Sequence, residues 1–472
     1  MSRPVLILWS AWTMANTTNG QVSFWYAAEG LPTPRPPLDG DVTCDVVIVG
    51  AGYTGLWTAH SLKKLAPDLE VVVVERRFAG FGASGRNGGW LTNSITGGRE
   101  QYVKEHGRAL VGRFQTLMNE TVDEVIRAAA EEGIDADIVK GGELTVARSE
   151  AQRARLGALA ASEAEWPEAG TVTLTAEEVT KRVRIDRAVA GLHHPHAARI
   201  QPAKLMQGLA AAVEKQGVRI MESTTATEIA AGRVVTDRGT VRARHVLRAT
   251  EGFTADLRAS HRDWLPLNSS MIATEPLSPE FWASIGWEGR EVFADEAHVY
   301  MYAQRTADDR IALGGRGKPY RFGSRTDSDG STPESTVELL RGVLESLFPE
   351  TRGVRIDHAW SGVLGVPRDW RATVGLDAAS GVGWAGGYVG TGVTTTNLAG
   401  RTLADLVLGR DTELTRMPWV GHRARRWEPE PLRWLAVGAI YGAYSAADRR
   451  EDAADTPATS RLATFADRLS GH

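Results

Sequence analysis

A chain of 472 residues is longer than one hydrophobic core normally serves, so its length predicts two or three domains. The composition, 42% hydrophobic and 24% charged, is that of an ordinary globular protein with ample apolar surface to bury. A net charge of −4 gives no electrostatic reason to bind nucleic acid or an anionic membrane. The single cysteine, Cys44, excludes a disulfide framework and a cysteine metal cluster, which is consistent with a reducing compartment.

The N-terminal residues include a short apolar run at 5–12 that lacks the charged flank and cleavage site of a signal peptide. No stretch reaches the roughly 18 to 20 consecutive apolar residues that a transmembrane helix needs. We therefore expect a cytoplasmic protein without a transmembrane segment. Met14 precedes a polar stretch and is an alternative translation start to Met1.

A buried strand that runs into a glycine-rich turn is the most informative stretch of the chain. Residues 45–49, Asp-Val-Val-Ile-Val, predict a parallel strand that leads into glycines at the G-x-G-x-x-G spacing, Gly50, Gly52 and Gly55. In this motif the first glycine permits the tight turn, the second lets backbone approach a pyrophosphate, and the third lets the helix pack on the strand. The helix expected at 54–65 offers N–H groups to phosphate. The motif therefore predicts dinucleotide binding.

Glu75 indicates which dinucleotides fit. Residues 70–74 predict a second buried strand, and Glu75 closes it twenty residues after Gly55. A carboxylate there accepts hydrogen bonds from the ribose hydroxyls of an adenosine and repels a 2′-phosphate, so NADP is disfavoured. A fortuitous glycine turn in another α/β protein is the alternative at this point.

A second glycine-rich block follows and is less generic. Residues 80–90 read Gly-Phe-Gly-Ala-Ser-Gly-Arg-Asn-Gly-Gly-Trp, which can wrap backbone around a planar or phosphorylated ligand; a flexible surface loop is the alternative. With the first motif and Glu75-Arg76, the block resembles the D-amino acid oxidase-like family of FAD-dependent amine and amino-acid oxidoreductases, and looks most like its γ-glutamylputrescine oxidase branch. In the family this block lies along the flavin. The resemblance implies that the pyrophosphate and isoalloxazine are contacted by Ser84, Arg86, Asn87, Gly88 and Gly89.

The resemblance continues in segments far downstream. It implies that Ala226 lends its backbone to adenine, and that the Ala-Thr-Glu-Gly turn at 249–252 lies near the ribityl chain and phosphate. Residues 383–394 match the family's closing flavin strand and glycine loop, whose N–H groups would face the N1/C2 carbonyl edge of the flavin. Because this segment lies roughly 300 residues beyond the first motif, it supports FAD over NAD independently.

The cofactor-binding residues predicted in this way are Gly50, Ala51, Gly52, Tyr53, Thr54, Gly55, Glu75, Arg76, Gly82, Ala83, Ser84, Arg86, Asn87, Gly88, Gly89, Trp90, Leu91, Ala226, Ala249, Thr250, Gly252, Gly387, Tyr388, Gly390, Thr391, Gly392, Val393 and Thr394. Some relatives hold the flavin through a cysteine. The only cysteine here, Cys44, is expected before the first strand and outside the relevant sheet. We therefore predict noncovalent FAD.

The predicted fold is α/β, with a Rossmann-like FAD-binding domain of the glutathione-reductase type, an inserted α+β substrate domain with a mixed or antiparallel sheet, and a C-terminal helical tail. The expected divisions are an N-terminal arm at 1–43, a discontinuous FAD-binding domain at 44–110, 195–263 and 354–410, a substrate-binding domain at 111–194 and 264–353, and a C-terminal helical extension at 411–472.

The N-terminal arm and the C-terminal extension are each expected to pack against another surface. Aromatic residues at 24–26 should anchor the N-terminal arm to the body, and the alternative is that Trp25 or Tyr26 helps to close a pocket. Residues 435–447 are mostly apolar or small and too few to span a bilayer. They should pack on the body or on a second subunit, which would make an oligomer, and the alternative is a membrane surface.

The substrate pocket has three candidate residues. Family resemblance makes a sheet the pocket floor, and its expected strands cover 270–276, 299–303 and 310–316. Strand alternation puts Tyr300 and Tyr302 on one face with His298, and we predict that Tyr302 lines the pocket. Arg316 is a carboxylate-binding guanidinium or a structural ion-pair partner, and Trp360 is the third candidate.

No metal site is predicted. The run His193-His194-Pro195-His196 could suggest one, because imidazoles are common metal ligands. Adjacent histidines around a proline do not share a helix face, and no carboxylate at useful spacing completes a ligand set.

The expected reaction is the oxidation of a C–N bond in a small-molecule amine, primary or secondary and similar to a polyamine derivative. In the family FAD takes a hydride equivalent at N5, the imine product hydrolyses, and the electrons pass to O2, giving H2O2, or to another acceptor. No obligatory general base is implied. Three alternatives stay open: an oxidase or dehydrogenase of an amino acid or N-methyl amino acid such as sarcosine or glycine, a nicotinamide-linked dehydrogenase, and a flavin-binding protein without a catalytic role.

Overall fold

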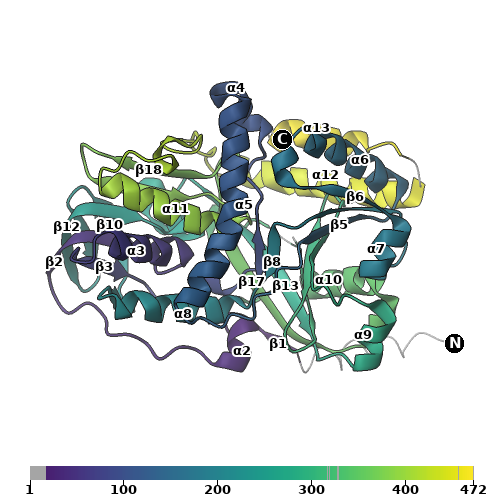
Figure 1. Ribbon diagram of the computed structural model, residues 1–472, viewed down its shortest axis with the longest axis horizontal. Coiled ribbons are helices and arrows are strands. Elements are labelled where there is room, and N and C mark those ends of the chain that lie inside the picture. Colours follow the sequence, from purple (N-terminus) through teal and green to yellow (C-terminus); the bar gives the residue numbers. More distant parts are fainter. Residues whose placement is uncertain (1–16, 316, 318, 327–328, 455–456, 471–472) are drawn as a thin grey trace.

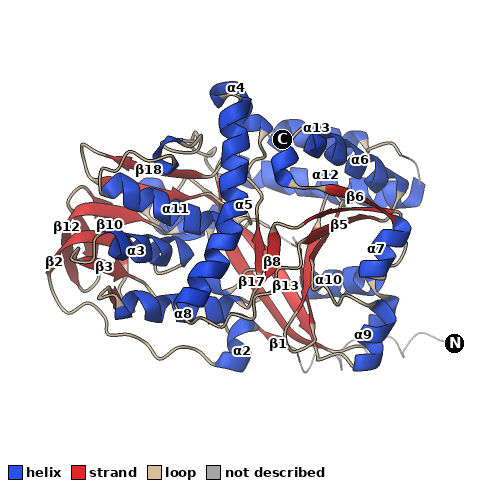
Figure 2. Cartoon of the chain, in the orientation of Figure 1, coloured by secondary structure: helices blue, strands red, loops and turns tan. Residues whose placement is uncertain are grey.

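The computed structural model describes residues 17–315, 317, 319–326, 329–454 and 457–470. Two sheets organise these residues, and they lie in the left and right halves of the view in Figure 1. Figure 2 shows helices around both sheets. The alternative starts Met1 and Met14 and the apolar run at 5–12 lie outside the described residues.

Apolar runs at 46–49 and 71–74 form neighbouring strands of the first sheet, since runs of valine and isoleucine suit strands that are covered on both faces. Five strands run parallel in the order β19, β12, β2, β3, β9. In spatial order the strands are β10 (Ala226–Ala230), β11 (Arg233–Thr236), β12 (Gly239–Arg248), β2 (Val42–Val49), β3 (Val71–Val74) and β9 (Arg219–Met221), with β19 (Val382–Gly386) beside β12 and β18 (Thr373–Asp377) beside β19. Because β2 begins at Val42, Cys44 lies inside it, and the expectation that Cys44 precedes the first strand is wrong.

Helices cover the first sheet with side chains that are almost fully buried. They are α3 (Tyr53–Leu65), α5 (Arg108–Glu131), α8 (Pro202–Lys215) and α11 (Gly392–Val407). Gly400 of α11 lets that helix approach α3 closely, since a Cβ at this position would lie 2.6 Å from the backbone of Trp57. The sequence divisions assigned most of α5 to the substrate part, yet Val122, Val125 and Ala129 pack into the core of the first sheet.

The second sheet is mixed, as predicted for the inserted part. Its neighbours are antiparallel except at β1 beside β17 and at β14 beside β5. In spatial order the strands are β1 (Thr18–Asn19), β17 (Ile356–Val366), β13 (Leu265–Thr274), β16 (Ile311–Gly315), β15 (Met301–Arg305), β14 (Val292–Asp295), β5 (Glu143–Ala147), β7 (Ala190–His194) and β6 (Val172–Thr175). The sequence divisions placed 354–366 with the FAD-binding part, but β17 pairs with β13 along almost its whole length.

Further elements surround the second sheet and connect it to the first. They are α2 (Trp25–Glu29), β4 (Trp90–Thr92), α4 (Glu100–His106), α6 (Glu150–Ala164), α7 (Ala176–Arg182), β8 (Ala197–Arg199), α9 (Pro279–Ile285) and α10 (Glu334–Leu347). Aromatic rings fill the core of this half: Trp287 stacks on Phe348 at 5.9 Å between centroids and meets Phe293 edge-on at 6.0 Å.

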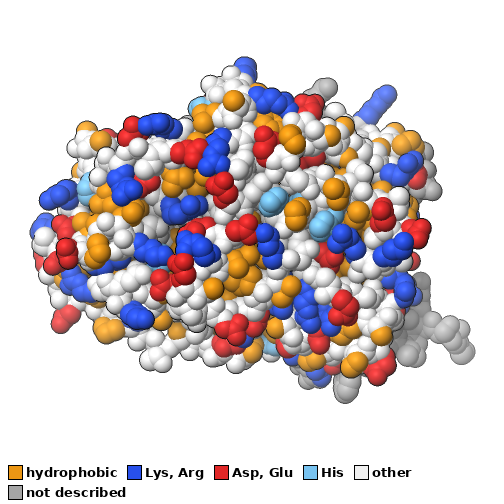
Figure 3. All heavy atoms as spheres, viewed as in Figure 1, with side chains coloured by type: hydrophobic (Ala, Val, Ile, Leu, Met, Phe, Trp, Pro, Cys, Tyr) orange, Lys and Arg blue, Asp and Glu red, His pale blue; other side chains and the backbone are white. Residues whose placement is uncertain are grey.

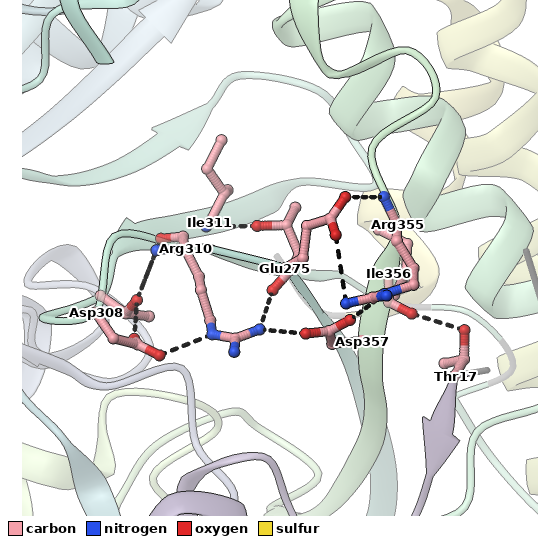
Figure 4. A network of polar contacts seen from close by, with 10 residues as sticks. Thr17, Glu275, Asp308, Arg310, Ile311, Arg355, Ile356 and Asp357 are labelled. Atoms are coloured by element: carbon pink, nitrogen blue, oxygen red, sulfur yellow. Dashed lines mark hydrogen bonds and ion pairs between the residues drawn. The ribbon is translucent and has the colours of Figure 1, made fainter. Parts of the chain in front are cut away.

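Charged side chains fasten the ends of three strands in the second sheet (Figure 4). Arg310, just before β16, donates to the Thr274 carbonyl oxygen at 2.7 Å and pairs with Asp357 of β17 at 2.6 Å. Arg355 donates to the other Asp357 oxygen, also at 2.6 Å. Strands β13, β16 and β17 are therefore held in register at this edge by a network around one carboxylate.

The chain ends in two helices, α12 (Leu432–Ala454) and α13 (Arg461–Ser470), drawn in yellow at the upper right of Figure 1. Helix α12 packs on the body, because Val437 joins a buried cluster with Leu265, Val366 and Trp427. Among the described residues, no helix combines the length and apolar character needed to cross a membrane. Positive and negative side chains are interspersed over the face shown in Figure 3.

Candidate active site

A cavity of about 460 Å³ lies where strands β2, β3 and β12 of the first sheet end. In parallel sheets ligands bind at these carboxyl ends, because successive loops meet there. Many predicted cofactor-binding residues line this cavity: Gly50, Gly52, Tyr53, Thr54, Glu75, Arg76, Gly82, Ala83, Ser84, Asn87, Ala226, Ala249, Thr250, Tyr388, Gly390, Gly392 and Val393. Residues from segments more than 300 positions apart thus surround one space.

The first glycine loop shows why glycine is needed at two of its positions. Gly50 has φ +109°, and a Cβ there would lie 2.5 Å from the carbonyl oxygen of Ala249. At Gly55 a Cβ would lie 2.0 Å from the carbonyl oxygen of Gly50. The turn between β2 and α3 is therefore too tight for any side chain at these positions.

Two helix N-termini reach the same cavity. Helix α3 begins after Gly52 and α11 begins after Thr391, and neither N-cap residue makes a side-chain capping hydrogen bond within the described chain. Residues Gly52 and Thr54 of the first terminus and Gly392 of the second line the cavity. N–H groups and positive dipole ends at these termini favour an anionic ligand such as a pyrophosphate.

Glu75 follows β3 directly and lines the cavity. Its carboxylate accepts the backbone N–H groups of Ala51 and Arg77, each at 2.9 Å. Burial raises the pKa of Glu75, and the two N–H donors oppose that rise. Arg76 also borders the cavity and pairs with Asp256 at 2.8 Å.

The second glycine-rich block is tied to the first. The backbone N–H of Tyr53, in the first turn of α3, donates to Ser84 Oγ at 2.9 Å. Asn87 folds back over the block, donating to the Ser84 carbonyl oxygen at 2.7 Å and accepting the Gly89 N–H at 2.8 Å. The two blocks therefore form one continuous wall of the cavity.

Three side chains from distant elements hold the second block from behind. Trp360 of β17 donates its ring N–H to the Arg86 carbonyl oxygen at 2.9 Å, Trp25 of α2 donates to that of Asn87 at 2.8 Å, and Gln304 of β15 donates to that of Gly88 at 2.7 Å. These carbonyl groups are thus hydrogen bonded on the side away from the cavity, which fixes the path of the loop.

Glu251 is a lining residue that the sequence predictions passed over, although its neighbours Thr250 and Gly252 were included. Its carboxylate accepts N–H groups of the downstream glycine loop, from Gly387 at 2.8 Å and from Tyr388 at 3.3 Å. Burial raises the pKa of Glu251 from its ordinary value of 4.5 to about 7, against the opposing effect of the N–H donors.

Comparison with known proteins decides the family. The family described as FAD dependent oxidoreductase (DAO) matches residues 45–406 of the chain. The chain belongs to the DAO family of FAD-dependent oxidoreductases.

Individual DAO-family relatives match most of the chain. γ-Glutamylputrescine oxidoreductase of Escherichia coli K12 is 32% identical over 443 residues, which cover 90% of this chain and 98% of that protein. The probable oxidoreductase OrdL of Haemophilus influenzae is 29% identical over 406 residues, covering 83% and 89% respectively. In structure, glycine oxidase from Geobacillus kaustophilus superposes with a TM-score of 0.68 at 21% identity, covering 81% of this chain and all of that one.

FAD is the cofactor that the family implies, and the cavity fits it. Two helix N-termini whose N-cap residues make no capping hydrogen bond, together with a wall of glycine backbone, suit the pyrophosphate, and Glu75 suits an adenosine ribose. Tyr388, Gly390 and Gly392, from the loop before α11, line the same cavity, and the Tyr388 hydroxyl hydrogen bonds to Thr54 Oγ1 of α3 at 3.1 Å. Cys44 is buried inside β2 and does not line the cavity, so no described cysteine is placed to bond the flavin.

Other predicted cofactor residues are not among the lining residues of the cavity. Gly89 leaves room for Gln304, whose Nε2 would lie 1.9 Å from a Cβ there, and Gly252 leaves room for Val363 at 2.7 Å. Arg86 is buried and donates its Nε–H to the Phe81 carbonyl oxygen at 2.7 Å. The remaining residues of this kind are Ala51, Gly55, Gly88, Trp90, Leu91, Gly387, Thr391 and Thr394.

Several lining residues were missed by sequence reasoning: Val49, Val74, Gly80, Phe81, Thr225, Thr227, Glu251, Phe253, Asp256, Leu257, Arg258, Val363, Leu364 and Thr396. Some are neighbours of predicted residues, so the motif boundaries were drawn too narrowly. Val363 and Leu364 come from β17, and no local motif marks them.

The substrate-pocket candidates have different positions. Tyr302 of β15 packs against Gly88, since a Cβ at Gly88 would lie 2.7 Å from its ring, and its hydroxyl hydrogen bonds to Ser269 Oγ at 2.7 Å. Trp360 is fully buried behind the second glycine block. Arg316 lies outside the described residues. Because β15 begins at Met301, His298 and Tyr300 lie in the preceding loop, so the prediction of one strand face shared with Tyr302 is wrong.

Proposed function

We propose that this protein oxidises a C–N bond of a small-molecule amine with noncovalently bound FAD, and that O2 accepts the electrons. The observation that carries the proposal is the single cavity that both glycine blocks and loop 388–392 line together. The name of the E. coli relative, γ-glutamylputrescine oxidoreductase, supports an amine as the substrate class. When bound, FAD supplies a two-electron oxidant for the carbon beside an amine nitrogen, and the resulting imine hydrolyses in water.

The chain's own residues bind and orient in this proposal. The N-termini of α3 and α11 hold anionic groups, and Glu75 accepts hydrogen bonds from the ribose. Trp25, Gln304 and Trp360 keep the second glycine block in one conformation. No proton-transfer group is assigned, because C–H oxidation of a neutral amine needs the correct orientation and an environment from which water is excluded.

We infer that the two sheets have different functions. The first sheet with α3, α5, α8 and α11 binds the cofactor, and the second sheet forms the floor of the substrate site. Relative to the sequence divisions, α5 moves to the cofactor part and β17 to the substrate part, as their packing supports. The cytoplasmic location and an oligomer formed through 411–472 stay predictions.

Spectroscopy and reduction assays test the proposal. Purified protein should absorb near 450 nm, and an amine from a panel should bleach that band without oxygen. Oxygen uptake with H2O2 formation then tests the acceptor. Acid precipitation should leave a colourless pellet, whereas a yellow pellet would show covalent flavin.

Amino acids and N-methyl amino acids belong in the same panel. They are a second substrate class, supported by the 23% identity to the sarcosine oxidase beta subunit of Rhodobacter capsulatus over 77% of the chain. A colourless protein that cannot take up added FAD would contradict the proposal as a whole.

A further inference from the structure

A second cavity, of about 650 Å³, shares a wall with the cofactor cavity. The shared wall is the loop before α11, whose consecutive residues face alternate sides. Tyr388, Gly390 and Gly392 line the cofactor cavity, and Val389 and Thr391 line the second cavity. The second cavity therefore adjoins the cofactor cavity at this loop.

The C-terminal helix α12 forms the roof of the second cavity. Its lining residues recur at helical spacing along one face: Leu432, Ala436, Val437, Ile440, Tyr441 and Tyr444. Opposite them, Leu265 and Leu267 of β13 and Val366 of β17 supply an apolar floor. The superposition with the Geobacillus kaustophilus glycine oxidase covers all of that enzyme but only 81% of this chain. Part of this chain therefore has no counterpart in that enzyme.

Polar contacts fasten both ends of this roof. At its C-terminal end Glu451 pairs with Arg155 at 2.6 Å and hydrogen bonds to His298 at 2.9 Å, while Asp448 accepts the backbone N–H of His298 at 2.8 Å. Before its N-terminal end Trp427 donates its ring N–H to the Val366 carbonyl oxygen at 2.7 Å. The roof is thus attached on both sides of the lining face.

The cluster of His298, Asp448 and Glu451 resembles a cation site by composition. The Arg155 guanidinium already lies against Glu451, and both Asp448 oxygens accept backbone N–H groups, of His298 at 2.8 Å and of Val299 at 2.9 Å. These contacts indicate a fastening of the roof.

The lining of the second cavity is mainly aliphatic and aromatic. The arginine described in it, Arg368, pairs with Glu428 at 3.3 Å and lies over the Trp427 ring. That guanidinium is therefore already engaged by a carboxylate, and the neighbouring surface comes from Tyr300, Trp370 and the roof helix. Such a cavity stabilises an apolar group far better than a carboxylate, because its described lining residues include no lysine and no arginine other than Arg368 to compensate a desolvated charge.

We propose that the second cavity is the substrate site, that α12 forms its roof, and that the substrate is an amine with an alkyl or aryl body and no α-carboxylate. This inference rests on the proposed function and names its substrate class. The amine nitrogen and its neighbouring carbon lie toward loop 388–392, and the apolar body lies under the roof. Substrate preference then follows the apolar area that the body buries.

A homologous series tests the substrate class. In the FAD-bound enzyme, the rate constant for anaerobic flavin bleaching at low substrate should rise about fourfold per methylene from propylamine to hexylamine, as burial of a CH₂ group predicts. Glycine, sarcosine and L-alanine should react more slowly than hexylamine. A faster reaction with these amino acids than with any alkylamine overturns the inference and leaves the proposed function standing.

A binding assay needs no oxidation. 1-Hexanol, titrated into the FAD-bound enzyme and followed by the flavin absorbance spectrum, should bind saturably, whereas acetate should not. Ile440→Gln, on the lining face of α12, should weaken 1-hexanol binding about tenfold. Leu435→Gln, on the solvent side of the same helix, should change it less than twofold.

Different results would contradict the proposed function and the inferred substrate site. If no amine or amino acid bleaches the flavin, the proposed function fails, and the hexanol titration still tests the cavity. Should Ile440→Gln not fold, Ala436→Phe replaces it, because added volume on the lining face should exclude 1-hexanol. Equal binding by the lining variant and by Leu435→Gln overturns the inference.

Discussion

The Glu251 carboxylate accepts the backbone N–H of Gly387 at 2.8 Å, which joins the segment after β12 to the glycine loop before α11. The same carboxylate reaches the Gly365 N–H at 3.4 Å, at the end of β17. One side chain therefore connects the two sheets beside the wall that both cavities share. Its burial raises its pKa to about 7, so this contact should respond to pH.

Glu251→Gln should change how stability depends on pH. A carboxyl whose folded pKa is raised stabilises the fold fully below its unfolded pKa, and this contribution is lost as pH rises from about 4.5 to about 7. A glutamine does not titrate. The free energy of unfolding of the apoprotein, wild type minus variant, should therefore fall between pH 4.5 and 8, by at most about 3 kcal/mol. Urea unfolding at both pH values measures it, and a pH-independent difference would show that Glu251 has an ordinary pKa.

Trp360→Phe should weaken FAD binding although Trp360 does not line the cofactor cavity. The change keeps an aromatic ring but leaves the buried Arg86 carbonyl oxygen without the 2.9 Å N–H donor that Trp360 supplies. An unpaired buried acceptor is unfavourable by about 1–3 kcal/mol, so the Kd for FAD should rise by roughly fivefold to 150-fold.

The matched control is Trp384→Phe. Trp384 lies in β19 and donates its ring N–H to the Thr373 hydroxyl at 3.0 Å, away from the second glycine block. It should change the Kd for FAD by less than about threefold. Quenching of flavin fluorescence during titration of the apoprotein measures both values. Equal effects of the two variants would mean that loss of a tryptophan, wherever it lies, weakens binding.

The sequence predicts the glycine blocks because their requirement is local. At Gly50 and Gly55 the obstacle to a side chain is backbone within six residues of the turn or at the adjoining strand end, so a short motif records it. Gln304 and Trp360 act through pairings of β15 and β17 that depend on the whole second sheet. No spacing in the sequence reports such contacts.

The position of helix α12 was also only partly predictable from the sequence. Its apolar and small residues predict packing on another surface, and the structure confirms packing on the body. Which side chains line a cavity depends on the rotation of the helix over β13 and β17, and that rotation is set by polar contacts such as Glu451 with Arg155. The ion pair between Arg155 and Glu451 joins two charges 296 residues apart in the sequence. No pattern in the sequence indicates that these two residues are in contact.

Gly55→Ala and Gly390→Ala should separate a steric requirement from a conformational one. At Gly55 the new Cβ would lie 2.0 Å from the Gly50 carbonyl oxygen, so either the turn or α3 must move. At Gly390 no atom lies within 4 Å of the new Cβ, and only the positive φ of +111° is unfavourable, by about 1–2 kcal/mol. Gly55→Ala should therefore abolish FAD retention during purification, while Gly390→Ala should retain it with a lower melting temperature. Full FAD retention by Gly55→Ala would contradict the tight turn.

Glu451→Gln should loosen the roof helix and leave the cofactor site intact. The substitution removes the charge that pairs with Arg155 at 2.6 Å, and both side chains are largely buried. Burial alone would raise the pKa of Glu451, but the Ser460 N–H, Arg155 and His298 together lower it below its ordinary value. The contact is therefore present above the unfolded pKa and is lost only as pH falls through the lower folded pKa, so wild type and variant should differ most near neutral pH.

Hydrogen exchange in α12 measures the loosening. Breaking a buried pair on one side typically destabilises by about 3–5 kcal/mol, so amides of 436–448 should exchange at least tenfold faster in Glu451→Gln. The KM for an alkylamine should rise, while the Kd for FAD should change less than twofold. Glu177→Gln is the control, since its ion pair with Lys181 on α7 is exposed and contributes little. Unchanged exchange in α12 of Glu451→Gln would mean that apolar packing of Val437 against β13 and β17 holds the roof without the ion pair.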